Sequence, residues 1–193
     1  MLCCVSKSGE KIPPLIVFKS QSKKPTSIIE VNDVFHCYTS SAWTNGHIMT
    51  LWMQHVFSRR TTAAKPCLLI MDNASFHKDE SFITELKQQG GRADFLPPNT
   101  TCRLQPLDHS INGLLKTFVR DEWTTWMRRP HPRVTKGGKL KVASKTELLG
   151  WIRTAWNRIK PENIVKSFSH CFLIDRQLPK VPKSRLRRRR NSL

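Results

Sequence analysis

The chain has 193 residues, 38% of them hydrophobic, which is enough apolar material for one ordinary core and little more. Its 33 Lys and Arg residues against 14 Asp and Glu give a formal net charge of +19, of the sign that attracts phosphate backbones. Eight of the 33 lie after Asp175, so 25 basic residues remain against 14 acids in residues 1–175. The positive charge is therefore spread over the body of the protein and predicts a basic working face.

The cysteines and the apolar runs argue against a secreted protein and against a membrane protein. The six cysteines show neither the CxxC spacing of a zinc site nor the density of a secreted disulfide scaffold, which favours buried thiols in a reduced compartment. No apolar run approaches the roughly 18 to 20 residues of a membrane helix, and Lys7 interrupts any secretory signal. We expect a soluble protein that is neither secreted nor embedded in a membrane.

The first third of the chain predicts strands and then a helix. Residues 2–6 and 15–18 are apolar and β-prone, and the turn Ser8-Gly9 between them indicates a hairpin. A second β-prone patch covers residues 28–38. Thr44-Asn45 then offers an N-cap for a helix with apolar residues at helical spacing, which we expect to end near residue 59.

The middle of the chain predicts a strand, a helix and a strand. Residues 67–71 are apolar throughout, which indicates a strand buried on both faces, with Asp72 at its carboxyl end. A helix over residues 80–89 should stop at Gly90-Gly91, before another short strand at residues 93–96. This order predicts a βαβ unit with a right-handed crossover.

The rest of the chain predicts loops, helices and a tail. Residues 97–101 indicate a rigid loop, and Pro106 marks the entry to a long amphipathic helix with Asp108 in its first turn. The following segments are an exposed loop at 128–141, helices at 144–159 and 161–172, and a disordered basic tail. We therefore expect one domain over residues 1–175 and a tail over residues 176–193.

Asp72 and Asp108 are the candidate catalytic and metal-binding residues. The strand, helix and strand order can bring both carboxylates to one edge of a sheet, where α/β folds place ligands. Such a pair suits Mg²⁺ or Mn²⁺, because hard cations prefer oxygen ligands. Each aspartate also has a purely local explanation, since Asp72 can form a turn with Asn73 and Asp108 can stabilise the first turn of its helix.

Two segments resemble signature blocks of one family. LLIMDNASFH at residues 68–77 and FLPPNTTCRLQPLD at residues 95–108 are similar to two blocks of the pogo/Tigger/jerky group of DDE superfamily endonucleases, which are transposases. Weaker similarity covers the hairpin, the helix at residues 43–57 and residues 148–172. The resemblance therefore spans nearly everything except the basic tail.

This resemblance implies an α/β fold of the RNase H-like type, a mixed sheet flanked by helices, in which three acids hold two divalent metal ions. Asp72 would be the second acid and Asp108 the third, with Asn73 and His77 beside the site. DNA would be the partner. The cations Lys116 and Arg120 would approach its phosphates, although solvation on an amphipathic helix is the simpler explanation for both.

The chain departs from the family's pattern at the first acid. In the family this acid lies on the first, central strand, and we expect the given sequence to begin after it, because Glu10, Glu30 and Asp33 fall in a turn and a connector. The triad becomes a dyad, and two-metal catalysis needs a carboxylate that bridges both ions. Loss of the strand should also leave backbone N–H and C=O groups of the neighbouring strands without hydrogen-bonding partners. Each such buried group costs about 1 to 3 kcal/mol of stability.

Three functional hypotheses follow. The protein is a fragment of a larger transposase that is active only with its upstream part, a domesticated DNA- or chromatin-binding protein without cleavage activity, or the product of a truncated gene. The tail adds a basic cluster that suits a nuclear import receptor or phosphates, and therefore indicates a nuclear protein. Its densest residues are Arg187, Arg188, Arg189 and Arg190. The sequence makes no prediction about the oligomeric state.

Overall fold

The computed structural model describes residues 1–20, 27–60, 65–129, 134–135, 137–139 and 141–171. The strands are β1 (Leu2–Val5), β2 (Lys11–Lys19), β3 (Ile29–Val31), β4 (Val34–Thr39), β5 (Cys67–Met71) and β6 (Gly91–Phe95). The α-helices are α1 (Gly46–His55), α2 (Glu80–Gln88), α3 (Thr101–Leu104), α4 (Asn112–Met127), α5 (Lys145–Arg158) and α6 (Pro161–His170). Short turns η1 (Phe57–Arg59), η2 (Ser75–Lys78) and η3 (Leu107–Ile111) complete the described elements. The predicted mixed α/β class is confirmed.

The strands form two separate sheets. The larger sheet has the order β1-β2-β4-β3, in which β1 and β2 make the predicted antiparallel hairpin and β2 runs parallel to β4. The smaller sheet consists of β5 and β6, which pair in parallel on either side of α2 in the sequence. The predicted strand, helix and strand unit is therefore present, and it places the carboxyl ends of β5 and β6 side by side.

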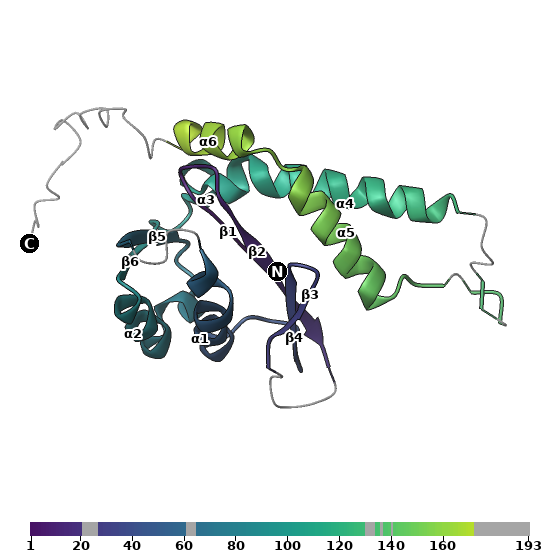
Figure 1. The fold of residues 1–193 in the computed structure, drawn as a ribbon, viewed down its shortest axis with the longest axis horizontal. Helices are drawn as coiled ribbons and strands as arrows, with labels where there is room; N and C mark the ends of the chain where they lie inside the picture. The colour runs from purple at the N-terminus through teal and green to yellow at the C-terminus, as the bar shows by residue number, and fades with distance from the viewer. Residues whose placement is uncertain (21–26, 61–64, 130–133, 136, 140, 172–193) are drawn as a thin grey trace, which may run out of the picture.

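Helices cover both faces of the larger sheet (Figure 1). Neighbouring residues on a strand point to opposite faces, so Leu15 of β2 enters one core and Ile16 another. Leu15 belongs to the cluster that α1 and α2 fill, with Phe82 as its largest fully buried α2 side chain. Ile16 packs in the cluster of Ile152 from α5, and a third cluster around Ile111 joins α4, α5 and α6. The hairpin is thus the central layer.

The outer edges of β1 and β5 are open within the described residues, because each strand has one ladder partner. Cys4 of β1 and Leu69 of β5 nevertheless pack into the same hydrophobic cluster, so both sheets share a core on one face. The expectation that residues 67–71 are buried on both faces is wrong. Leu68 is 47% exposed, because no described element covers its face of the β5–β6 pair.

Local side-chain contacts explain where the helices begin and end. The Asn45 side chain accepts a hydrogen bond from the Ile48 amide, as the predicted N-cap of α1. Ser144 and Glu147 form a capping box at the start of α5. At the other end of α5, the Lys11 ammonium donates to the carbonyls of Trp156 at 2.7 Å and Ile159 at 2.8 Å, which ties the hairpin to the negative end of the helix dipole.

Three boundaries differ from the sequence-based expectation. The first helix ends at His55 and continues as the tighter turn η1 instead of running to residue 59. A short helix, α3, occupies the end of the expected rigid loop. The segment after Pro106 opens as a π-helix before it becomes α4. The predicted tail at 176–193 lies outside the described residues.

The prediction of buried thiols holds for Cys37 and Cys171, whereas Cys3, Cys4 and Cys67 are partly buried. Cys3, Cys4, Cys37, Cys67 and Cys171 are free. Burial raises the pKa of both Cys3 and Cys4 to about 12, so neither supplies a thiolate at neutral pH. Among the helices of the described ranges, none is both long and apolar enough to cross a membrane.

The hairpin turn carries the first testable prediction. Gly9 has a φ of +92° and is packed against the start of α6, where an added Cβ would lie 2.9 Å from Cβ of Pro161. Gly9→Ala should lower the free energy of unfolding by about 2 to 4 kcal/mol, through backbone strain together with this clash. Gly90→Ala is the matched control, because Gly90 has a φ of +71° and open space around it, and it should cost about 1 to 2 kcal/mol in the same urea titration. Equal losses would show that the contact with α6 contributes nothing.

Candidate active site

Asp72 lies directly after β5, at the mouth of the β5–β6 pair. Its carboxylate oxygen Oδ1 accepts a hydrogen bond from the Ala74 amide at 3.2 Å, and Nε2 of His77 lies 3.2 Å from the same oxygen. The side chain is 38% exposed, so the carboxylate can be reached from solvent. The local turn explanation and the site explanation are therefore compatible, because Oδ1 closes the turn while the side chain stays accessible to solvent.

His77 is a neutral neighbour of this carboxylate. Its side chain is only 12% exposed, and burial lowers its pKa below the ordinary value, while the nearby Asp72 charge acts in the opposite direction. The imidazole is therefore uncharged at neutral pH and leaves the negative charge of Asp72 available to a cation. Within the described residues Nδ1 of His77 is buried and has no hydrogen-bonding partner.

Asp108 lies in the π-helical turn η3, where the Asn112 amide reaches back to the Leu107 carbonyl. Nδ2 of Asn112 donates a hydrogen bond to Oδ1 of Asp108 at 2.8 Å, and the aspartate is otherwise exposed. π-helical turns are rare and occur often at functional sites, because the inserted residue changes the direction of a side chain. The irregular turn is therefore consistent with a functional Asp108.

Asp72 and the segment that leads to Asp108 both leave the carboxyl ends of the β5–β6 pair. The Leu96 amide donates to the Met71 carbonyl at 2.8 Å, so the pairing continues to the point where Asp72 begins. From Leu96 the chain passes through the loop and α3 to the Asp108 turn. The buried Ser167 hydroxyl of α6 donates to the Pro106 carbonyl and anchors this turn.

The donor chemistry of this edge fits a hard divalent cation. Each aspartate has one oxygen that the described hydrogen bonds and ion pairs leave uncommitted, and carboxylate oxygens are the ligands that Mg²⁺ and Mn²⁺ prefer. Two carboxylates are fewer than a two-metal site uses. In the described ranges no group of three or more His, Cys, Asp or Glu side chains could hold a metal ion.

The remaining predicted site residues differ in their placement. Asn73 directly follows Asp72 and is exposed in the same turn. Lys116 and Arg120 are exposed one helical turn apart on α4, as the solvated-cation explanation also predicts. The arginines at 187–190 lie outside the described residues.

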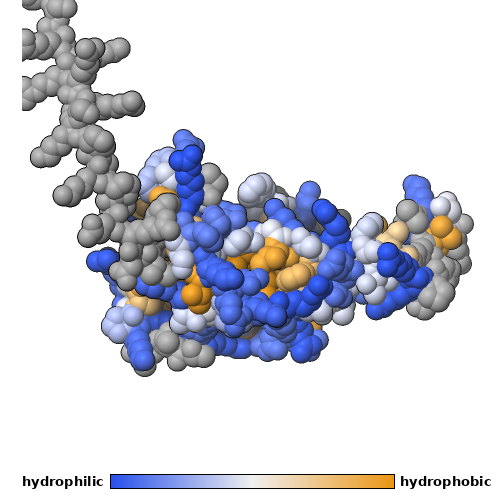
Figure 2. Space-filling model, turned by 90° about the horizontal axis from the view of Figure 1, so that it is seen from above, coloured by the Kyte–Doolittle hydropathy of each residue, from blue (hydrophilic) through white to orange (hydrophobic). Residues whose placement is uncertain are grey.

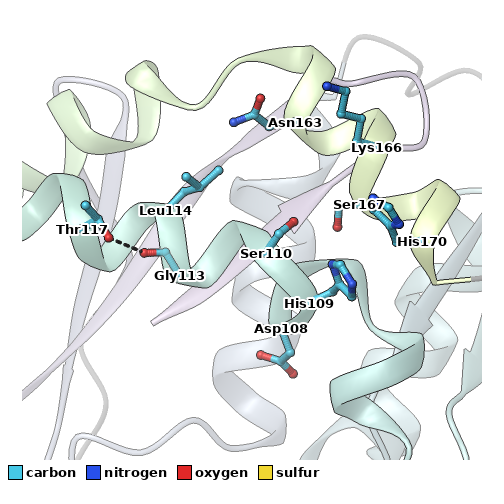
Figure 3. A pocket seen from close by; sticks show the side chains of 10 residues that line it. All are labelled: Asp108, His109, Ser110, Gly113, Leu114, Thr117, Asn163, Lys166, Ser167 and His170. Carbon is cyan, nitrogen blue, oxygen red and sulfur yellow. Dashed lines mark hydrogen bonds between the residues drawn. The ribbon is translucent and has the colours of Figure 1, made fainter.

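Sequence reasoning missed a hollow on the other side of the Asp108 turn (Figure 3). It has a volume of about 470 Å³ and lies between the start of α4 and α6. The rings of His109 and His170 stack there, with centroids 5.1 Å apart and planes 16° from parallel. His109 stands next to Asp108 in the sequence, but no spacing rule connects it with His170 on α6.

Comparison with known proteins assigns the chain to a family. The DDE superfamily endonuclease family matches residues 1–168, so the chain belongs to that family. It is similar to the mouse protein "Pogo transposable element with KRAB domain", with 25% identity over 92% of this chain and 32% of that protein. The human protein of the same name is 25% identical over 88% of this chain and 28% of its own length.

A third relative is the human protein "Pogo transposable element with ZNF domain", which is 22% identical over 64% of this chain and 9% of its own length. The chain therefore spans less than a third of the relatives that it matches. No solved structure matches, so the RNase H-like assignment stays a prediction. The resemblance to pogo-type DDE endonucleases is confirmed.

Proposed function

We propose that this chain is a DNA-binding DDE endonuclease domain that does not cleave DNA unaided. The proposal is supported by two solvent-accessible carboxylates, Asp72 directly after β5 and Asp108 on the segment that follows β6, in a body with a large excess of basic residues. The basic surface attracts the phosphate backbone, while two carboxylates cannot fix two metal ions at the spacing that in-line attack requires.

Mg²⁺ or Mn²⁺ is the cofactor that this site would take. When bound, such an ion activates water or a hydroxyl group for attack on a phosphodiester. Asp72 and Asp108 would hold it through their free oxygens, and the uncharged His77 would keep the Asp72 turn in place without cancelling its charge. Asn73 borders the same turn.

The test of DNA binding is a salt titration of the full chain with two unrelated labelled DNA duplexes. A surface that contacts about five phosphates should give a slope of about −4.5 in log K against log salt, or a loss of roughly 500-fold between about 50 and 200 mM salt. Fluorescence anisotropy measures this slope. An affinity that does not change with salt concentration, or a strong preference for one duplex, would contradict the proposal.

A second candidate function is a working nuclease formed together with an upstream strand. The open edges of β1 and β5 favour it, because both strands border one hydrophobic cluster and leave their outer ladder groups available. An acid on that strand would complete the triad that the family uses. A nuclear location is part of both proposals, since the basic residues from Lys183 onward suit an import receptor.

A further inference from the structure

The hollow beside the Asp108 turn has a lining rich in hydrogen-bond donors. Lys166 stands at its rim on α6 with an exposed ammonium group, and Asn163 lies one turn earlier on the same helix. The stacked rings of His109 and His170 close one end, and an imidazole offers an N–H donor in either protonation state. Figure 3 shows these side chains on the α6 side of the turn, whereas the Asp108 carboxylate points away from α6.

The hollow is held in shape by the packing beneath it. Ser167 of α6 is buried and donates its hydroxyl hydrogen to the Pro106 carbonyl, which fixes the helix to the π-helical turn. Ile111 and Ile164 are fully buried in one cluster under the same contact. The helix and the turn that carry the donors are therefore fixed to each other, which reduces the entropy that binding would cost.

The donors of the lining and the net charge of +19 favour an anion as the ligand. Asp108 is the one acid in the described lining, and one of its oxygens is already engaged by Asn112. Figure 2 views the molecule from the side where α4 and α6 lie, and hydrophilic side chains surround a central apolar area on this face. Leu114 provides an apolar part of the hollow's wall, which suits a sugar beside a phosphate.

We propose that this hollow is a binding subsite for a backbone phosphate of DNA, contacted by Lys166, Asn163 and the His109–His170 pair. A strand that presents one phosphodiester to Asp108 would place a neighbouring phosphate against α6, on the other side of the same turn. The subsite would hold the strand in register with the candidate active site. This inference rests on the proposed DNA-binding function and adds the place where one strand is held.

The experiment compares two variants of the full chain that lose the same charge from the same region. Lys166→Gln removes the rim ammonium, whereas Lys160→Gln removes an exposed lysine that precedes α6 and does not line the hollow. In salt titrations with a labelled duplex, Lys166→Gln should reduce the salt slope by about 0.9 and weaken binding about 3- to 10-fold. Lys160→Gln should change binding less than about twofold, because only long-range attraction is lost.

A second readout follows the imidazoles. In proton NMR, adding the unlabelled duplex should shift the ring signals of His109 and His170 in the wild type and in Lys160→Gln. If both lysine variants bind equally well, or if the ring signals stay in place while DNA binds, the subsite is wrong although the DNA-binding function stands. If the wild type does not bind DNA at all, the proposed function and the subsite fail together.

Discussion

Plasmid DNA mixed with this chain and millimolar Mg²⁺ or Mn²⁺ is expected to stay supercoiled, whereas a version extended upstream by a strand that carries an acid is expected to nick it. The physical reason is that two-metal catalysis needs a carboxylate that bridges both ions, and Asp72 and Asp108 alone do not supply it. In the extended protein, Asp72→Asn should lower the nicking rate on the order of 10³- to 10⁴-fold, because the amide keeps the shape of the side chain and removes its charge. Conversion of supercoiled to open-circular plasmid on a gel measures the rate.

The matched control for this prediction is Asp94→Asn. Asp94 is an exposed aspartate on β6, so the substitution removes the same charge close to the site without touching its edge. Its nicking rate should equal that of the extended parent protein, and a chelator should stop both. Metal-dependent nicking by the unextended chain that disappears in Asp72→Asn would contradict the claim that the dyad is insufficient.

Filling the space between β1 and β5 is expected to stabilise the protein. An added strand would pair with both open edges and extend the hydrophobic cluster that β1 and β5 share. A net gain of about 3 kcal/mol would raise the midpoint of thermal unfolding by roughly 6 to 12 °C for a chain of this size. Differential scanning calorimetry of the extended and the original chain gives the midpoints. Amide hydrogen exchange should slow in β1 and β5, because their edge amides gain partners.

A proline-substituted extension separates strand pairing from added length. Prolines at alternate positions of the new strand remove its N–H donors and prevent it from joining the ladder. This version should unfold at the temperature of the original chain. If it stabilises the protein as much as the intact extension does, or if β5 gains no protection from exchange, then no strand enters between the two sheets.

Several features of the fold follow from local sequence alone. The Ser8-Gly9 turn defines the hairpin because a positive φ favours glycine there, and Asn45 marks the start of α1 because its short side chain caps the helix. The apolar run at residues 67–71 forms a strand that leads to Asp72, as its composition predicts. These effects act between residues that are close in the sequence. They therefore do not depend on how the rest of the chain folds.

Other features depend on partners that are distant in the sequence. Ser167 is buried because α6 is anchored on the Pro106 carbonyl, 61 positions earlier and next to the π-helical Asp108 turn. The partial exposure of β5 was mispredicted for a similar reason. An apolar composition indicates that a strand can be covered on both faces, whereas only the arrangement of helices decides whether it is.

The sequence by itself determined the family of this protein and its basic character, and it supplied the two candidate aspartates, because signature blocks and charge are properties of the residue order. Only the tertiary structure decided that the strands separate into two sheets with open edges, that His77 is buried beside Asp72, and that His109 meets His170. The physical reason is that ladder pairing, desolvation and ring stacking depend on which distant segments come together. Local pattern does not specify those partners.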